Sequence, residues 1–259
     1  IIGLTALLSL SSFAAADEAL PWDGRVQDLE VNTLANKYLA DVLFGHANPT
    51  SYVNVTQTGR SPAYNGDTGI ITLGVDAKAV YKGETSTRRS DLMQTVAANS
   101  EGTTFFRTSV MKDKAFLNPY VWQLVFPGSY LFEIRVDAAA NPPMISYVND
   151  GKTDAKWKSE FVSGTWYNFG VGVTKSQSGS GTVLAFYTSQ GDKDLVLEGT
   201  HEIAPALPAS FEYHIGLLTQ SADGSDPVMN AEMETMLFNG VSIETSVVTA
   251  AAGAANTPA

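Results

Sequence analysis

The feature that most constrains the fold of this chain is a strict alternation of side chains between residues 130 and 137. One of the two alternating sets is entirely apolar, which is the period of a half-buried β-strand and not of a helix. That set is expected to face a hydrophobic core and the other to face outward: Tyr130, Phe132, Ile134 and Val136 inward, and Leu131, Glu133, Arg135 and Asp137 outward.

Short runs of the same β type, separated by turn residues such as Asn149-Asp150-Gly151, recur along most of the chain. One helical segment is expected at residues 32–44, because its apolar side chains lie near helical spacing. The pattern predicts an all-β fold, an antiparallel two-sheet β-sandwich of jelly-roll type with a short N-terminal helix. The expected strands are 69–75, 85–93, 103–111, 120–126, 130–136, 144–148, 165–173, 182–188, 211–219 and 235–243.

The chain has 259 residues, of which 44% are hydrophobic, so it can bury one sizeable core. Residues 1–16 resemble the hydrophobic and cleavage regions of a secretory signal peptide whose basic start is missing. Residues 17–245 are expected to form a single β-jelly-roll domain, and residues 246–259 a low-complexity tail or linker. We therefore expect a secreted, extracellular protein, with association to a cell wall left open; the glycosylation sequon at Asn54 agrees with secretion.

Charge and composition narrow the function. The net charge of −11 argues against nucleic acid or an anionic membrane as a partner, because both need a basic patch. The chain has no cysteine, and its histidines show no metal-ligand spacing, so neither a metal nor another cofactor is expected. We expect a monomer. Carboxylates, histidines and aromatic side chains remain, and these are the groups that glycan chemistry uses.

Strand parity places several of these groups on one face. Arg89 and Asp91 lie on the same side of their expected strand. Glu212 and His214 lie opposite the apolar side of theirs. If the two strands are neighbours, these side chains and Glu133 line a common concave surface. The alternative that spacing leaves open is a structural ion pair between Arg89 and Asp91, beside a histidine whose hydrogen bonds are satisfied.

An ordered set of short motifs resembles glycoside hydrolase family 131, whose members are secreted fungal β-glucanases. The motifs cover most of residues 22–244 and are WDGR at 22–25, RRSDL at 88–92, TSVMKD at 108–113, QLVF at 123–126, GTWYN at 164–168, EYHIG at 212–216 and FNGV at 238–241. The resemblance implies a β-jelly roll with a groove that binds β-linked glucans. It also implies that the groove cleaves them without a metal, by an inverting mechanism.

Two departures from the family pattern affect catalysis. Asp91 stands where the family has a catalytic glutamate, and the lost methylene withdraws the carboxylate by about 1 Å, which can lower a rate by ~10²-fold. By an ungapped register, the second catalytic glutamate of the family falls on Gly128, which cannot transfer a proton. His214 matches a histidine of the family's groove. Glu133 matches a further family glutamate, for which a structural or substrate-contacting role is expected.

Two functions therefore remain open. The first is hydrolysis of β-1,3-, β-1,6- or β-1,4-glucan by an inverting acid–base mechanism, and the second is glucan binding by a cell-wall protein that has lost its carboxylate pair. A lyase acting on acidic polysaccharide is disfavoured, because a net charge of −11 repels such a substrate. The catalytic candidates are Asp91, His214, Glu133 and Glu212, and the substrate-binding candidates are Arg89, Arg107, Gln123, Arg135 and Trp122.

Overall fold

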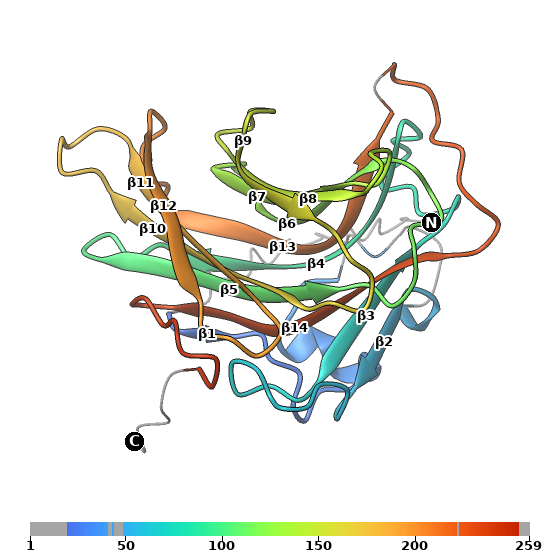
Figure 1. Cartoon of the computed structure of the whole chain (residues 1–259), viewed down its shortest axis with the longest axis horizontal. Helices are drawn as coiled ribbons and strands as arrows, with labels where there is room; N and C mark the ends of the chain where they lie inside the picture. The colour runs from blue at the N-terminus through green and yellow to red at the C-terminus, as the bar shows by residue number, and fades with distance from the viewer. Residues whose placement is uncertain (1–19, 41–42, 44–48, 222, 254–259) are drawn as a thin grey trace, which may run out of the picture.

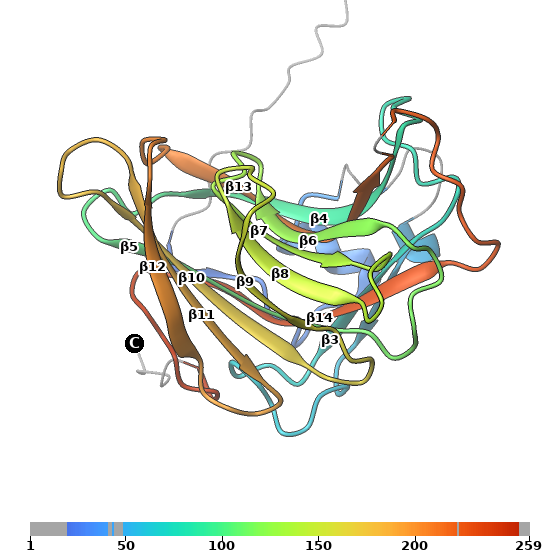
Figure 2. The ribbon, with the colours of Figure 1, turned by 45° about the horizontal axis from the view of Figure 1, so that its top comes forward.

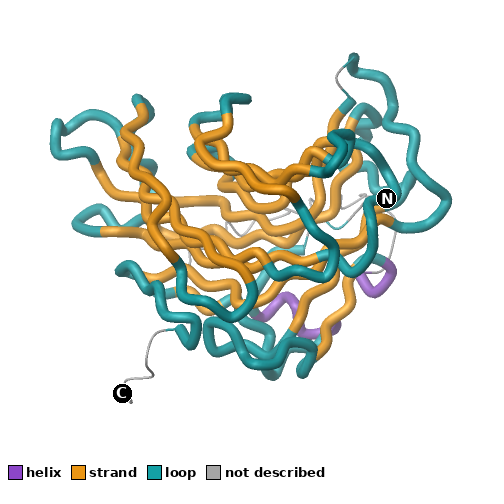
Figure 3. Tube along the Cα trace, viewed as in Figure 1, coloured by secondary structure: helices purple, strands orange, loops and turns teal. Residues whose placement is uncertain are grey.

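A computed structural model describes residues 20–40, 43, 49–221 and 223–253, and nearly all of its regular structure is β (Figure 3). The expected signal segment at 1–16 lies outside the described residues. The strands are β1 (Trp22–Asp23), β2 (Val53–Thr56), β3 (Ile70–Val75), β4 (Thr87–Ala97), β5 (Thr103–Met111), β6 (Val121–Pro127), β7 (Phe132–Asp137), β8 (Met144–Asn149), β9 (Ala155–Glu160), β10 (Tyr167–Lys175), β11 (Thr182–Gln190), β12 (Val196–Ile203), β13 (Ser210–Gln220) and β14 (Glu234–Glu244).

These strands form two antiparallel sheets, as predicted (Figure 1). The six-stranded sheet has the order β4-β13-β6-β7-β8-β9. The eight-stranded sheet has the order β12-β11-β10-β5-β14-β3-β2, with β1 paired to β14. In Figures 1 and 2 the six-stranded sheet lies over the larger one, and the β10–β12 end of the larger sheet curves up beside it. The result is a β-sandwich whose smaller sheet keeps one face open.

The core fills the space between the two sheets. Phe106 of the larger sheet contacts three aromatic rings of the smaller one, with centroid distances of 5.0–5.2 Å to Phe132, Phe211 and Tyr213. The buried hydroxyl of Tyr213 forms a 2.5 Å hydrogen bond with Thr108 Oγ1 across the same space. The apolar sides of β7 and β13 are thus inside the sandwich, so their polar sides face away from it.

The predicted alternation is correct from Phe132 to Val136 and wrong before it. Tyr130 lies in a turn with φ 54°, and its N–H donates to the carbonyl of Pro127. The left-handed backbone of Tyr130 is not extended, and β7 begins only at Phe132, so the alternation does not continue back to Tyr130. Tyr130 is therefore 36% exposed, whereas Leu131 is buried in the core, the opposite of the expectation for both.

Two further expectations differ from the structure. The segment expected to be helical at 32–44 contains a 3₁₀ helix, η1 (Val31–Asn36), and parts of its second half lie outside the described residues. A second short 3₁₀ helix is η2 (Pro49–Ser51). The expected tail at 246–259 is packed on the larger sheet as far as residue 253, since Leu195 N–H donates to the Thr249 carbonyl and Arg107 donates to that of Ala250. No described helix is long and apolar enough to cross a membrane.

Four strands have no counterpart among the expected ones: β1, β2, β9 and β12. Each of them pairs with only one other strand and so lies at an edge. In β9, exposed charged residues alternate with half-buried ones, and β12 is exposed over most of its length. Edge strands bury less apolar surface than central ones, so their hydrophobic pattern is weak.

Trp122 provides a test of the core. Its side chain is completely buried in the core, and its indole N–H donates to the carbonyl of Asn118. Trp122→Ala is expected to lower the free energy of unfolding by about 3–5 kcal/mol, because it removes a large buried ring. Urea unfolding measures this change. The control Val196→Ala, at a side chain that is 61% exposed, should change it by less than about 0.5 kcal/mol; an equally small effect of Trp122→Ala would contradict the core assignment.

Candidate active site

The open face of the six-stranded sheet carries the predicted polar side chains. β4 and β13 pair along their full length, with Gly216 opposite Asp91 and Met93 opposite His214. Because alternate residues share a face, Asp91, His214 and Glu212 all lie on the side away from the core. The expected proximity of Asp91 and His214 is confirmed, since His214 Nδ1 lies 2.5 Å from Asp91 Oδ2.

Asp91 is the centre of a buried ionic network. Its two carboxylate oxygens accept hydrogen bonds from Arg89 Nε at 3.0 Å and Nη2 at 2.6 Å, and Oδ2 also contacts His214. The side chain of Asp91 has no exposed surface. Burying a carboxylate is unfavourable unless it is paired and hydrogen-bonded, and here a bidentate arginine and a histidine meet that need. Asp91 is therefore placed to hold Arg89 and His214, and a substrate cannot reach it.

His214 connects Asp91 to a second carboxylate, that of Glu212. Nε2 of His214 lies 2.9 Å from Glu212 Oε1, and the Glu212 side chain is 53% exposed. Carboxylates only accept hydrogen bonds, so both ring nitrogens must carry a proton when both acidic groups are ionised. His214 then acts as a cation between two anions. The ring of Phe126 stacks on it at 4.8 Å and shields one side of it from water.

Gly128 lies beside this network. Its N–H donates to the carbonyl of Glu212, and a Cβ placed on it would contact the Glu212 Cβ and carboxylate oxygen at 3.4 Å. A side chain at this position would therefore stand next to Glu212. The family register places a catalytic glutamate at Gly128. In this chain the carboxylate of Glu212, on the neighbouring strand, lies beside that position.

Glu133 is a separate carboxyl group on the same face, and its surroundings differ from those of Asp91. Only 3% of the residue is exposed, yet its nearest partners are distant: Gln123 Nε2 at 3.3 Å and Arg135 Nη1 at 3.8 Å. Burial raises the pKa of Glu133, and these two neighbours offset part of that rise. A carboxyl of this kind keeps its proton to higher pH than an exposed one does.

The strand order sets the separation between Glu133 and His214. Ile134 of β7 pairs with Val125 of β6, and Val125 pairs with Ile215 of β13. Glu133 and His214 each come one residue before Ile134 and Ile215, so they lie in one row that runs across the three strands. Two strand spacings separate their backbones, which is roughly 9–10 Å. Phe126 of β6 occupies the position between them in that row, with its ring stacked on His214.

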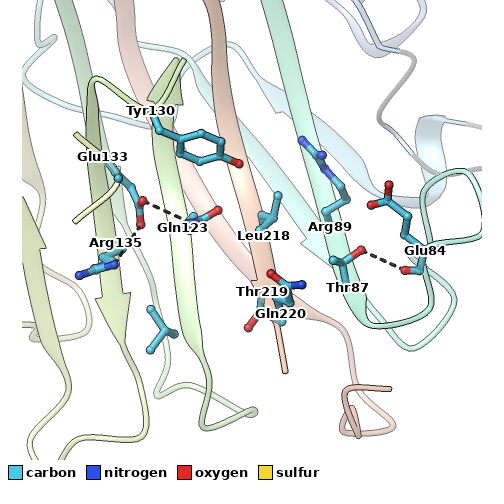
Figure 4. Close-up of a pocket in the computed structure, with 12 residues that line it drawn as sticks. Glu84, Thr87, Arg89, Gln123, Tyr130, Glu133, Arg135, Leu218, Thr219 and Gln220 are labelled. Atoms are coloured by element: carbon cyan, nitrogen blue, oxygen red, sulfur yellow. Dashed lines mark hydrogen bonds and ion pairs between the residues drawn. The ribbon is translucent and has the colours of Figure 1, made fainter. Parts of the chain in front are cut away.

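A cavity of about 560 Å³ opens on this face beside Glu133 (Figure 4). Gln123, Glu133 and Thr219 line the cavity, and each has a buried side-chain oxygen with no hydrogen-bond partner among the described residues. Unpaired buried polar atoms are unfavourable, so each of them marks a place where the polar interactions of this face are incomplete. The cavity is lined by Glu84, Thr87, Arg89, Val121, Gln123, Tyr130, Glu133, Arg135, Gly151, Leu218, Thr219 and Gln220.

Seven of the nine predicted site residues share the open face. Arg89, Asp91, His214 and Glu212 are in direct contact, and Gln123, Glu133 and Arg135 line the cavity next to them. The other two lie elsewhere. Trp122 is in the core. Arg107 is buried on the other sheet, where it donates to the carbonyl of Ala250.

Tyr130 lines the cavity and was missed, because the alternation placed it in the core. The turn sequence Pro127-Gly128-Ser129 before it was the one available signal that the alternation could break there. No described group of three or more His, Asp or Glu side chains is arranged to hold a metal ion.

The comparison with known proteins agrees with this arrangement. Residues 20–249 match the family model of the glycoside hydrolase 131 catalytic N-terminal domain. The chain belongs to glycoside hydrolase family 131. No relative was found among curated protein sequences.

Two solved structures of family 131 have a similar fold. One is the β-glucanase catalytic domain from Podospora anserina, with a TM-score of 0.71 and 21% identity over 90% of this chain and 98% of that one. The other is the catalytic domain of the family 131 protein from Coprinopsis cinerea, with a TM-score of 0.70 and 21% identity over the same shares of the two chains. These similarities confirm the predicted fold, and the match of residues 20–249 to the family model confirms the predicted family.

Gly216 tests the network around Asp91. A Cβ at this position would lie 2.2 Å from the Ser90 carbonyl oxygen and 2.5 Å from the Asp91 Cβ. Gly216→Ala is expected to lower the free energy of unfolding by at least about 2 kcal/mol, because the backbone must move. Gly172→Ala is the matched control, because a Cβ there would lie 3.4 Å from its nearest neighbour. It should lower the free energy of unfolding by less than about 1 kcal/mol. If chemical unfolding shows that the two variants lose the same free energy of unfolding, the close approach of β4 to Gly216 is contradicted.

Glu133 makes stability depend on pH. The pKa of Glu133 is higher in the folded state than in the unfolded chain, so the unfolded chain releases this proton first as pH rises. The free energy of unfolding therefore falls as pH rises, until the pH passes the folded-state pKa. Glu133→Gln, which cannot ionise, is expected to gain stability relative to the native protein between about pH 3.5 and pH 7. Thermal unfolding at both pH values measures the difference. A difference that stays constant, or that falls with pH, would be the opposite result.

Proposed function

We propose that this family 131 protein hydrolyses β-glucans at the open face of its six-stranded sheet, with inversion at the anomeric carbon. One observation carries the proposal: a buried carboxyl with a raised pKa faces a polar cavity, two strands away from the Asp91–His214–Glu212 network. Inverting hydrolysis needs one carboxyl that is protonated and one that is ionised. On this face Glu133 and Glu212 have different surroundings, and we assign one of the two roles to each.

Glu133 is the proposed general acid. Its burial favours the protonated form, and the cavity gives a substrate access to it. Its proton passes to the glycosidic oxygen as the bond between that oxygen and the anomeric carbon breaks. Arg135 and Gln123 then stabilise the carboxylate that is left, because both can donate hydrogen bonds to it.

Glu212 is the proposed general base. It is the accessible carboxylate of the network, whereas Asp91 is enclosed. It removes a proton from the water that attacks the anomeric carbon from the face opposite the leaving group. His214 orients Glu212, and Asp91 fixes His214 from the other side. Glu133 and His214, the residue that holds Glu212, stand two strands apart, roughly 9–10 Å between backbones.

A neutral polymer of glucose fits the site best. The cavity offers hydrogen-bonding groups of both kinds, and both of its arginines already have partners: Arg89 pairs with Asp91, and Arg135 donates to the carbonyl of Thr153. A net charge of −11 also disfavours acidic polymers. The substrates to test are β-1,3-, β-1,6- and β-1,4-glucans. We propose an extracellular place of action, supported by the signal-like sequence at 1–16 and by the polymeric substrate.

The enclosure of Asp91 favours a second candidate function, glucan binding without cleavage. Asp91 stands at the position that the family resemblance gives to a catalytic glutamate, and it has no exposed surface. If Glu212 does not replace it as the base, the groove binds β-glucan and turns none of it over. The two functions make different predictions for the same set of variants.

The test is a reducing-sugar assay on the three β-glucans with the native chain and with Glu133→Gln and Glu212→Gln. Each substitution is expected to lower kcat by at least about 10²-fold, because general acid and general base catalysis contribute about 10²–10⁴-fold each. Glu101→Gln, in an exposed turn, is the control and should keep native activity. Proton NMR of the first product should show the α-anomer, as inversion at a β-linkage requires.

Each outcome separates the candidates. A β-anomer as first product would contradict the inverting mechanism. Native turnover that survives Glu212→Gln but not Asp91→Asn would move the base to Asp91. Binding of a glucan in affinity electrophoresis, without turnover of any of the three polymers, would select the binding protein over the hydrolase.

A further inference from the structure

Tyr130 has a backbone conformation that is unusual for an aromatic residue. Its φ of 54° lies in the left-handed region, which bulky side chains rarely adopt. Two hydrogen bonds hold it there: its N–H donates to the carbonyl of Pro127, and its own carbonyl accepts from the N–H of Gly151. Strained residues of this kind persist where the surrounding structure fixes them, and they cluster at functional sites.

The ring of Tyr130 is the outer member of an aromatic stack on the open face. It lies parallel to Phe126, with an interplanar angle of 2° and a centroid distance of 5.4 Å. Phe126 in turn lies parallel to the His214 ring at 4.8 Å. The stack ties the position of Tyr130 to the Asp91–His214–Glu212 network. At 36% exposure, Tyr130 still presents much of its surface to the cavity.

The hydroxyl group of Tyr130 lies among the charged groups of the site. The Arg89 cation and the carboxylates of Glu133, Asp91 and Glu212 all act on its pKa, which burial raises above the ordinary value. The phenol is therefore a neutral hydrogen-bond donor throughout the pH range in which a glucanase works. It forms no hydrogen bond with any described residue, so its O–H is available to a ligand. Figure 4 shows its oxygen directed across the cavity toward the side of Arg89.

We propose that Tyr130 is a substrate-contacting residue, whose hydroxyl donates a hydrogen bond to the sugar bound in the cavity beside Glu133. This inference rests on the proposed hydrolysis for its effect on kcat, but the contact itself also applies to a protein that only binds glucan. The strained turn and the stack on Phe126 fix where the hydroxyl points. The contact orients the sugar ring relative to the acid and the base, and orientation of this kind acts mainly on kcat.

The test uses two substitutions of Tyr130 and one control. Tyr130→Phe keeps the ring and removes the O–H, and it is expected to lower kcat by about 10-fold or more with a smaller change in KM. Tyr130→Asn keeps a residue that tolerates the left-handed backbone and removes the ring. It is expected to lower kcat/KM by about 100-fold or more while the melting temperature is retained or raised. Tyr187→Phe removes an O–H on the other sheet and should match the native kinetics.

The outcomes distinguish this inference from the proposed function. If the native chain cleaves a β-glucan and both Tyr130 variants stay within about twofold of its kcat/KM, the contact is wrong and the hydrolysis stands. A purely structural role predicts the reverse of our expectation, a lower melting temperature for Tyr130→Asn with unchanged kinetics. If the native chain binds β-gluco-oligosaccharides without cleaving them, calorimetric titration decides: weaker binding by Tyr130→Asn supports the contact, and unchanged binding overturns it. A native chain that neither cleaves nor binds them overturns both.

Discussion

The pairing of β4 with β13 is the constraint on which the rest of the site depends. It places Gly216 directly opposite Asp91, and the absence of a side chain there lets the carboxylate lie against the neighbouring strand and reach His214. A buried carboxylate is tolerated only with partners, and Arg89 and His214 supply them from the same two strands. Removal of Asp91 would take from Arg89 and His214 the carboxylate that they share.

The open face therefore holds two carboxyl groups in opposite surroundings. Glu212 belongs to a hydrogen-bonded chain that runs from Arg89 through Asp91 and His214 to Glu212. Glu133 lies beyond Phe126, where burial dominates and the neighbouring donors are too distant to compensate fully. Environments that drive two carboxyls toward different protonation states are how acid–base pairs are made from identical side chains. The aromatic ring of Phe126 contributes by separating the two surroundings.

Most of the strands and the shared face of the site could be predicted from the alternation of residues in the sequence, and each failure of that prediction has a physical cause. Period-2 alternation located the central strands, because each buries one full face, while the edge strands β9 and β12 bury too little to show a clear pattern. Parity also placed Asp91 and His214 on one face correctly. It failed at Tyr130, where a left-handed turn residue precedes the strand and ends the alternation. The residue type alone does not fix the sign of φ for a tyrosine.

The sequence by itself determined the fold class, the family and the set of polar residues available to chemistry, since these follow from hydrophobic period and ordered motifs. Only the tertiary structure decided which of them meet. Trp122 and Arg107 had the right chemistry for a sugar site, but the first belongs to the core and the second to the other sheet. Which strands become neighbours depends on contacts between residues far apart in the chain, and burial, which sets the protonation of Glu133, exists only after those contacts form.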